Sequence, residues 1–316
     1  MIRKFFLLSF SFLFFISCTD SEINYVNRSD NTQRYDSQIF ETITITKDVR
    51  YGANVTLGGV TQGLTMDIYQ PENDTEINRP LIVLAHGGSF ISGDKSNLSE
   101  TATFLAKAGY VVASINYRLL DITPTQLAFK QVVLNAVADM KAAVRFFNKD
   151  TAIDNIYKID SNNIFIGGYS AGAITALHYA YLNTTSELTT IGGSTFVDYV
   201  TANGGLEGKS GNETYSSAVK GVINISGSLF DKNFINLNEP SLYSIHGTAD
   251  AVVPYLNGNV NSTGILTDGS GVIHPYATTI GIHNELKTIT DGKHDAFLNC
   301  NSCSVEIRTF IFSQLK

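Results

Sequence analysis

The sequence is poor in several residue types, and each shortage narrows what the protein can be. Tryptophan is absent, so any aromatic binding surface must come from the 15 Tyr and 19 Phe. Only 16% of the residues are charged, and the 22 Lys and Arg are outnumbered by 29 Asp and Glu, which gives a formal charge of −7. No basic stripe of the kind that neutralises phosphates is present, which argues against nucleic acid as a partner.

The sequence also lacks a linker that would divide it into two halves. No low-complexity segment, charge block or internal repeat divides its 316 residues, and 43% of them are hydrophobic, enough to bury a sizeable core. This composition excludes an intrinsically disordered or collagen-like chain. We expect one folded domain over residues 39–316.

The N-terminus has the pattern of an export signal. Arg3 and Lys4 precede an apolar, charge-free run over residues 5–17, the order of a secretory signal peptide. The run is too short to span a bilayer comfortably as a mature helix. We therefore expect residues 1–17 to be a signal peptide and the protein to be exported.

The end of that run, Phe15-Ile16-Ser17-Cys18, resembles the lipobox of bacterial lipoproteins, in which the cysteine becomes the lipidated N-terminus. The resemblance implies lipidation of Cys18, with membrane contact only through that anchor and a place in the cell envelope. Residues 18–38 then form a flexible tether. Plain secretion and an uncleaved anchor are the alternatives.

Two cysteines remain, Cys300 and Cys303, in the sequence Cys-Asn-Ser-Cys. Two ligands do not make a structural zinc site, which needs four. A thioredoxin-like motif would open a helix after the first strand of a βαβ unit, whereas this pair lies near the C-terminus. We expect a local disulfide, since the protein is predicted to be exported, and no metal site.

The hydrophobic pattern predicts a three-layer α/β sandwich. Residues 41–55 and 64–70 alternate apolar and polar side chains, as in an antiparallel pair at a sheet edge. Continuous apolar runs are typical of strands buried on both faces of a parallel sheet, and they occur at residues 81–85, 110–115, 164–166, 222–225 and 242–245. Helical patterns lie between and after them, at residues 98–108, 126–148, 171–182, 275–285 and 305–314. The polar segment 183–217 is predicted to be a small cap inserted over the carboxyl edge of the sheet.

A serine between glycines follows one of these strands directly. Gly168-Tyr169-Ser170-Ala171-Gly172 stands between a short buried strand and a helix, which is the context of a nucleophile elbow. Glycines two residues either side let the strand and helix pass closely, and the amide of Ala171 points towards the anion formed when Ser170 attacks a carbonyl. The alternative is a glycine-rich turn with an incidental serine.

A serine nucleophile needs a base, and the base needs an acid to fix its tautomer. Asp250 follows the strand at 242–245, and His294 lies in the loop after a strand predicted at 286–289. Alone, a loop aspartate is most often a turn or cap residue, and a lone histidine is most often on the surface or in the core. Serine, acid and histidine in this order at successive strand ends predict the triad Ser170, Asp250 and His294.

Several other acidic residues and histidines are alternatives to these three. Asp231 is the alternative acid, and Asp295 adjoins His294, although sequence neighbours seldom orient each other's side chains. His246 is expected to hydrogen-bond within its own loop and His178 to pack in the core. His274 and His283 fall on or beside a predicted surface helix, and no role is assigned to them.

The loop after the first long apolar strand reads His86-Gly87-Gly88-Ser89-Phe90. Together with the elbow, it makes the chain resemble the α/β-hydrolases, specifically the carboxylesterases and hormone-sensitive-lipase-like esterases, from about Asp67 to the C-terminus. The resemblance implies that the amides of Gly88 and Ser89 join that of Ala171 in an oxyanion hole, with His86 bracing the loop. Ser89 replaces the usual third glycine, so Gly87 is an alternative donor.

The resemblance also implies an activity: two-step hydrolysis of a carboxylic ester through an acyl-enzyme, without metal or organic cofactor. The expected substrates are small-molecule or polymer esters with short, acetyl or feruloyl-type acyl groups. The small polar cap argues against a lipase with a large apolar lid. The alternatives are a serine peptidase of the prolyl-oligopeptidase type, which usually adds an N-terminal propeller for which this length has no room, and a non-catalytic binding protein on a hydrolase scaffold.

Overall fold

The structure is a computed structural model that describes residues 33–261 and 263–315. The predicted signal peptide, Cys18 and residues 18–32 of the predicted tether lie outside the described residues. No helix in the described part is long and apolar enough to cross a membrane.

Residues 33–38, the last part of the predicted tether, contact the rest of the structure. The guanidinium of Arg34 pairs with the carboxylate of Asp74 at 2.5 Å. The amide of Tyr35 donates to the carbonyl of Ala108 at 2.8 Å, and the hydroxyl of Tyr110 donates to the carbonyl of Tyr35 at 3.0 Å. These contacts place residues 33–38 with the folded domain.

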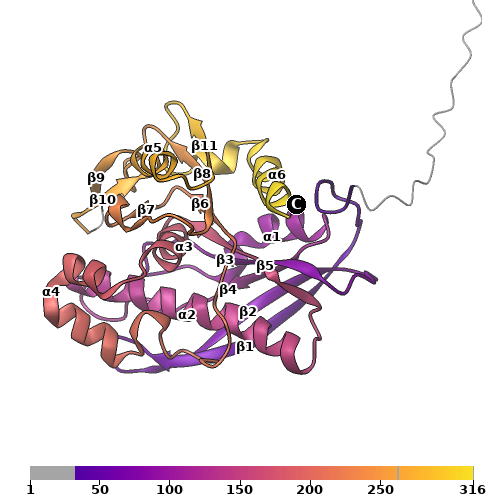
Figure 1. The fold of residues 1–316 in the computed structure, drawn as a ribbon, viewed down its shortest axis with the longest axis horizontal. Coiled ribbons are helices and arrows are strands. Elements are labelled where there is room, and N and C mark those ends of the chain that lie inside the picture. Colours follow the sequence, from indigo (N-terminus) through magenta and orange to yellow (C-terminus); the bar gives the residue numbers. More distant parts are fainter. Residues whose placement is uncertain (1–32, 262, 316) are drawn as a thin grey trace, which may run out of the picture. The chain divides into compact units, whose positions relative to one another are not determined.

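The centre of the fold is an eight-stranded sheet in the order β1-β2-β4-β3-β5-β6-β8-β11 (Figure 1). The pairs β1–β2 and β2–β4 are antiparallel, and every other pair is parallel. The strands are β1 (Ile43–Val55), β2 (Thr61–Pro71), β3 (Arg79–Ala85), β4 (Val111–Ile115), β5 (Ile159–Tyr169), β6 (Gly221–Ile225), β8 (Ser241–Gly247) and β11 (Asn284–Ile289). The predicted edge hairpin and the mostly parallel sheet are thereby confirmed.

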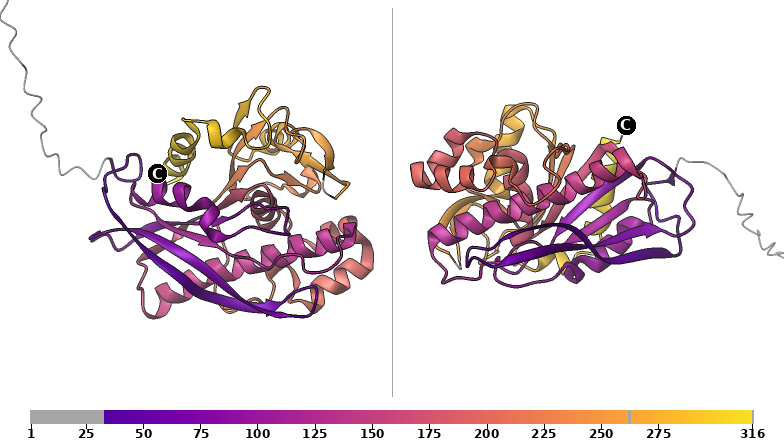
Figure 2. Two further views of the ribbon diagram at one scale, coloured as in Figure 1. Left: turned by 180° about the vertical axis from the view of Figure 1, so that it is seen from behind. Right: turned by 90° about the horizontal axis from the view of Figure 1, so that it is seen from below.

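Helices cover both faces of this sheet, which confirms the three-layer α/β architecture (Figures 1 and 2). Leu81 and Val83 of β3 pack into one core cluster with α2, α3, α4 and α5, whereas Ile82 packs into a second with α1 and α6. Successive side chains of a strand point to opposite faces, so a strand covered on both sides must be apolar throughout. The helices are α1 (Ser99–Ala106), α2 (Gln126–Ile153), α3 (Ala171–Tyr181), α4 (Thr185–Ala202), α5 (Ser270–Ile280) and α6 (Cys303–Gln314).

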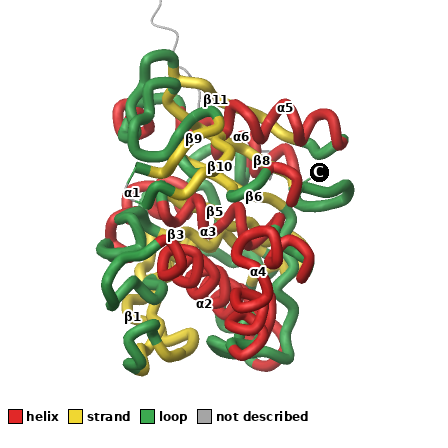
Figure 3. The backbone as a smooth tube through the Cα atoms, turned by 90° about the vertical axis from the view of Figure 1, so that its left-hand side faces the viewer, coloured by secondary structure: helices red, strands yellow, loops and turns green. Residues whose placement is uncertain are grey.

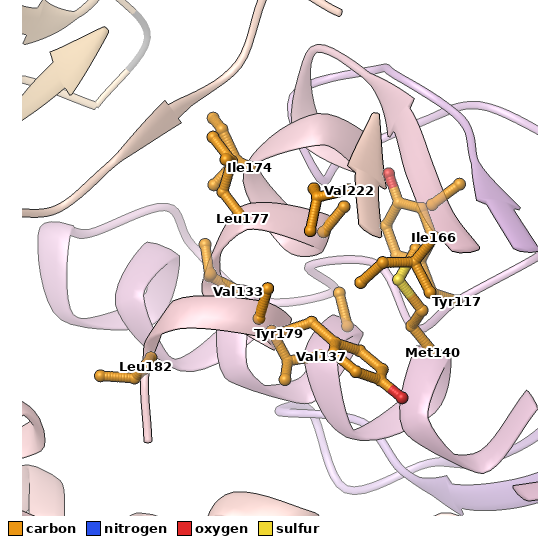
Figure 4. Close-up of a cluster of buried hydrophobic side chains, with 14 of the residues drawn as sticks. Tyr117, Val133, Val137, Met140, Ile166, Ile174, Leu177, Tyr179, Leu182 and Val222 are labelled. Atoms are coloured by element: carbon orange, nitrogen blue, oxygen red, sulfur yellow. The ribbon is translucent and has the colours of Figure 1, made fainter. Parts of the chain in front are cut away.

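The packing of α3 against α2 fixes the helix that follows the predicted nucleophile. Val133 and Val137 of α2 meet Ile174 and Leu177 of α3 in the larger core cluster (Figure 4). All four side chains are buried. Since interiors are close-packed, α3 has little freedom to shift relative to α2 and the sheet.

One helix begins and ends earlier than its pattern predicts. The sequence suggests a helix over residues 275–285, but α5 covers Ser270–Ile280 and residues 284–289 form β11. Gly281 ends the helix: its φ is +91°, and its amide donates to the carbonyl of Ala277 at 3.0 Å. Glycine is favoured in this left-handed position because it has no Cβ. The apolar residues beyond it therefore belong to a strand.

A second, three-stranded sheet is a feature that the hydrophobic pattern did not predict. It has the order β7-β10-β9, with β7 (Ser228–Leu229), β9 (Asn257–Val260) and β10 (Ile265–Gly269). The hairpin of β9 and β10 lies between Asp250 and α5 along the chain. These strands have only two to five residues, and β9 is partly exposed throughout, so their periodicity gives only a weak signal.

The predicted cap, residues 183–217, forms α4 and a short 3-10 helix, η3 (Gly205–Glu207). α4 lies beside α2 (Figure 3), where the ammonium of Lys130 donates to the carbonyl of Ile191 at 2.6 Å. Further along, the carbonyl of Ser210 accepts from the amide of Ala53 in β1 at 3.0 Å. The last part of this segment therefore packs against the edge strand and away from the carboxyl ends of the central strands.

A buried ion pair ties the loop after β4 to α2. The guanidinium of Arg118 lies 2.7 Å from Oδ1 and 2.9 Å from Oδ2 of Asp139, and both side chains are fully enclosed. The hydroxyl of Ser210 also donates to Asp139 at 2.6 Å. The pair thus joins three segments that are distant in sequence.

Four 3-10 helices occur in the described loops: η2 (Lys95–Leu98), η3, η4 (Lys232–Phe234) and η5 (Ala296–Asn299). η5 leads into the disulfide between Cys300 and Cys303, which joins the end of η5 to the start of α6. The cysteine pair that the sequence suggested as a local disulfide is thus bonded in the structure.

Candidate active site

Ser170 lies at the turn between β5 and α3. Its φ is +55°, a conformation that residues with a Cβ rarely adopt and that is often found at functional sites. Gly168 and Gly172 allow the turn to approach β3: a Cβ on either would come within 2.4 Å or 2.0 Å of the carbonyl oxygen of Ala85. Strand and helix can therefore cross only because both positions are glycine.

The loop after β11 brings His294 to this turn. Its Nε2 accepts from the hydroxyl of Ser170 at 2.8 Å, and its Nδ1 donates to Oδ2 of Asp250 at 2.7 Å. The carbonyl of His294 accepts from the hydroxyls of Tyr169 at 3.2 Å and Ser226 at 3.1 Å. The structure thus brings together the three residues predicted as a triad.

Asp250 is enclosed at the end of β8. Its Oδ1 accepts from the amides of Val252 at 2.8 Å and Val253 at 3.0 Å. Burial would raise the pKa of Asp250, but hydrogen bonds from His246 and His294 outweigh burial and hold the pKa well below its usual range. The carboxylate therefore stays charged, as it must to orient an imidazole and stabilise its protonated form.

The alternative acids lie elsewhere or make no such contact. The Asp231 carboxylate accepts from the amide of Asn233 at 2.8 Å and caps η4. Asp295 precedes η5 and makes no side-chain cap bond. Within the described residues, the carboxylate that contacts the ring of His294 is that of Asp250.

Three other histidines, His178, His274 and His283, make no contact with Ser170, Asp250 or His294 in the described structure. His178 is fully buried, with Nδ1 donating to the carbonyl of Ile174 and Nε2 accepting from the amide of Phe230. His283 is exposed and lies 3.4 Å from Glu285. His274, expected on a surface helix, is buried on the inner side of α5, and its Nδ1 lies 2.8 Å from Oδ1 of Asn284.

The loop after β3 presents free main-chain amides. Gly88, Ser89 and Phe90 have consecutive positive φ values of +119°, +53° and +60°. In the described structure, the amides of Gly87, Gly88 and Ser89 donate no hydrogen bond to another group of the chain. Ala171 is the first residue of α3, where an amide has no partner within the helix. All the predicted oxyanion donors are therefore available.

His86 and its neighbours support this loop. The His86 ring stacks on Tyr117 with centroids 4.5 Å apart, and its Nδ1 donates to the carbonyl of Gly87 at 2.7 Å. The Tyr117 hydroxyl donates to the carbonyl of His86 at 2.8 Å. Beyond the loop, Lys95 pairs with Asp67 of β2 at 3.0 Å. These contacts hold the loop against the sheet.

A narrow apolar cavity opens beside Ser170. It offers about 30 Å³ to a water-sized group, room for roughly two water molecules. α2 contributes Phe129 and Val133, α3 contributes Ile174, and the small sheet contributes Val260 and Ile265. Sequence reasoning missed the residues from α2 and the small sheet, because only the tertiary fold brings them to Ser170.

A wider cavity of about 370 Å³ lies next to the first and shares Phe230 and Ile265 with it. Its lining is more polar and includes Gln126, Lys130 and Asp231. α4 of the predicted cap contributes to this wider cavity and, among the described residues, not to the narrow one.

The chain is similar to one protein family and to several esterases of known structure. The BD-FAE family profile matches residues 66–229, and no curated protein matches the chain. A truncated carbohydrate esterase from gut microbiota is 19% identical, with a TM-score of 0.57 over 86% of this chain and 96% of its own. Esterase 2 from Thermogutta terrifontis, phosphonylated by cyclosarin, is 18% identical, with a TM-score of 0.60 over 87% and 95%.

A bifunctional GH43-CE protein from Bacteroides eggerthii is 21% identical, with a TM-score of 0.61 over 86% of this chain and 35% of its own. At these identities the structural likeness shows the fold, which is that of the α/β-hydrolases. The family match rests on more than half of the sequence. The chain belongs to the BD-FAE family.

Proposed function

We propose that the protein is a serine carboxylesterase. The observation that carries this proposal is the continuous hydrogen-bonded chain from the Ser170 hydroxyl through His294 to Asp250, facing the free amides of the loop after β3. The names of the structural relatives, a carbohydrate esterase and esterase 2, support it.

In the proposed reaction, His294 Nε2 takes the hydroxyl proton as Oγ of Ser170 attacks the ester carbonyl carbon. The carbonyl oxygen becomes an oxyanion and accepts from the amides of Ala171, Gly88 and Ser89, with Gly87 as an alternative. The carbon–oxygen bond to the alcohol breaks, and the alcohol leaves with the proton from His294. Water then attacks the acyl-serine, giving up its proton to His294, and releases the acid and the free serine.

The two cavities suggest how an ester is placed. The narrow apolar cavity beside Ser170 suits a short acyl group such as acetyl, since it has space for only a few heavy atoms. A feruloyl group would need this cavity to open. The wider, more polar cavity suits the alcohol part, either a small molecule or a sugar of a polymer.

A substrate panel tests the proposal. The panel would compare p-nitrophenyl esters of rising chain length with acetyl-xylan, feruloyl esters and peptides. We expect turnover of acetyl esters to exceed that of longer esters, and no peptide cleavage. Peptide hydrolysis without ester hydrolysis would instead favour the peptidase.

Covalent labelling tests the nucleophile separately. An active-serine fluorophosphonate should modify Ser170, and Ser170→Ala should abolish the adduct. Labelling that persists in Ser170→Ala would assign the nucleophile to another residue. A chain whose serine does not react at all would favour the non-catalytic binding protein.

We also propose that the protein is exported and held at the cell envelope by a lipid on Cys18, on the evidence of the charged and apolar N-terminal sequence. Full-length protein expressed in a bacterium should then partition into detergent, and Cys18→Ser should move it to the aqueous phase. Full detergent partitioning of Cys18→Ser would contradict the proposal.

A further inference from the structure

A second histidine lies against the carboxylate of Asp250. His246, in β8, is fully buried, and its Nε2 lies 3.3 Å from Oδ2 of Asp250, the oxygen that accepts from His294. The same Nε2 lies 3.1 Å from the carbonyl oxygen of Val253. The predicted contacts of His246 within its own loop are therefore contacts with the acid itself.

The partners of His246 assign its tautomer. Both neighbours of Nε2 are acceptors, so this nitrogen carries a proton. Nδ1 lies 2.9 Å from Oγ of Ser270 in α5, and that oxygen accepts from Nδ2 of Asn224 at 3.1 Å. The hydroxyl of Ser270 therefore donates its proton to Nδ1 of His246.

Asn224 is fixed in turn by β8 and by the turn after β6. Its Nδ2 donates to Oγ of Ser244 at 2.9 Å, and its Oδ1 accepts from the amide of Gly227 at 2.9 Å. Asn224, Ser244, Ser270 and His246 are all completely enclosed. A buried polar network costs free energy unless its members are satisfied, and a satisfied one fixes side chains in a single arrangement.

The network ends at the loop that holds Asp250. His246 faces the Val253 carbonyl and the Asp250 carboxylate, while the Val253 amide donates to the other carboxylate oxygen. Oδ1 of Asp250 therefore has two main-chain donors and Oδ2 lies between two imidazoles. Rotation of the carboxylate away from His294 would break contacts on both oxygens.

We infer that His246, held in the Nε2–H form by Ser270 and Asn224, is a positioning residue that keeps Asp250 aligned with His294. The inference rests on the proposed function, because alignment matters only if His294 acts as a base. His246 touches neither Ser170 nor the site of a substrate, so it acts through Asp250.

Two amide substitutions form a matched test. In His246→Gln the side-chain amide can reach the position of Nε2 and donate to Asp250 and Val253. In His246→Asn it reaches only the position of Nδ1. We expect His246→Gln to keep kcat within about threefold and His246→Asn to lower it roughly tenfold to a hundredfold at unchanged KM, the range of a hydrogen bond to a charged group.

A double-mutant cycle separates positioning from general stability. If His246 acts through Asp250, His246→Asn should change the rate less than about threefold in an Asp250→Asn background. The control is His274→Gln, a buried histidine on α5 whose ring contacts Asn284, which should leave kcat unchanged. Equal rates for His246→Gln and His246→Asn, or equal losses in both backgrounds, would overturn the inference.

The rate at which a fluorophosphonate labels Ser170 gives a second readout that needs no ester substrate. If the wild-type protein reacts with the label but hydrolyses no ester of the panel, the proposed substrate class is wrong. The labelling rates of the His246 variants then still test the inference about His246. If wild-type Ser170 does not react, both proposals fail. Circular dichroism and melting temperature confirm that each variant is folded.

Discussion

The three residues of the candidate site lie in loops that follow three different strands, and their contacts with one another determine what each can do chemically. Ser170 follows β5, Asp250 follows β8 and His294 follows β11, and each is placed at the carboxyl end of its strand. Because neighbouring parallel strands end at the same edge of a sheet, the three side chains meet although 124 residues separate Ser170 from His294.

If Ser170, His294 and Asp250 act as proposed, Asp250→Asn should reduce kcat by about 10⁴-fold, as removal of the acid does in serine triads, because the amide leaves His294 in the wrong tautomer. Ester hydrolysis by purified protein would measure this loss. Asp231→Asn is the control, since its carboxylate caps η4 and lines the wider cavity without contacting His294, and it should retain a near-normal kcat. The opposite pattern would transfer the role to Asp231.

At the scale of helices and strands, the packing around Ser170 determines the shape of the cavity beside it. α2, β9 and β10 line the narrow cavity beside Ser170, and their side chains leave little room in it. The loop after β3 faces the same serine with free amides. The shape of this cavity therefore depends on packing between elements and not on any motif.

Phe129→Ala should enlarge the narrow cavity, because Phe129 lines it from α2. We expect the ratio of kcat/KM for butyrate over acetate esters to rise roughly tenfold, the selectivity that one or two methylenes carry in a pocket. Stability should fall by about 3–5 kcal/mol, as for other Phe→Ala changes in cores. Chain-length profiles and urea denaturation would measure both effects.

Phe146→Ala provides the comparison for this prediction. Phe146 is on the same helix and packs against the core, but it does not line the cavity. It should lower stability without changing the chain-length preference. A similar shift in both variants would mean that the preference reflects a loosened α2 and not the size of the cavity.

At the scale of the whole molecule, buried charges and buried neutral histidines set stability. Arg118 and Asp139 connect α2, the loop after β4 and the segment around Ser210. His178 and His274 are enclosed without charge, and burial lowers the pKa of each to about 4. Both features link the stability of the fold to groups outside the candidate active site.

Asp139→Asn should destabilise the fold by about 3–5 kcal/mol, because it leaves the Arg118 guanidinium buried without a negative partner. Urea denaturation would measure the change. Replacing both residues, as Arg118→Met with Asp139→Leu, should cost less than the single substitution, since no charge then remains in the core. A larger loss in the double variant would contradict this account.

The two buried histidines should make stability fall in mild acid. Their pKa values of about 4 in the folded state lie below the value of about 6.5 in an unfolded chain, so the unfolded state binds more protons between these pH values. Each histidine then lowers the free energy of unfolding by up to about 1.4 kcal/mol per pH unit as pH drops from 6.5 to 4.

Denaturant unfolding at several pH values between 4 and 7 would measure this slope. His178→Gln and His274→Gln should each make it shallower. His283→Gln is the control because His283 is exposed, and it should leave the slope unchanged. An equal effect of all three substitutions would show that the two buried rings do not cause the acid sensitivity.

Local sequence determined the features that adjacent residues encode. Continuous apolar runs predicted the buried strands and the glycines around Ser170 predicted the elbow, because each pattern is set by backbone geometry over a few residues. The order of Ser170, Asp250 and His294 at successive strand ends predicted the candidate triad, because the carboxyl ends of parallel strands lie at one edge of the sheet. Tertiary structure alone decided the contents of the narrow cavity, the path of residues 183–217 and the link from His246 to Asn224. These depend on which distant side chains fill the same space, and that is settled by packing across the whole core and not by any local period.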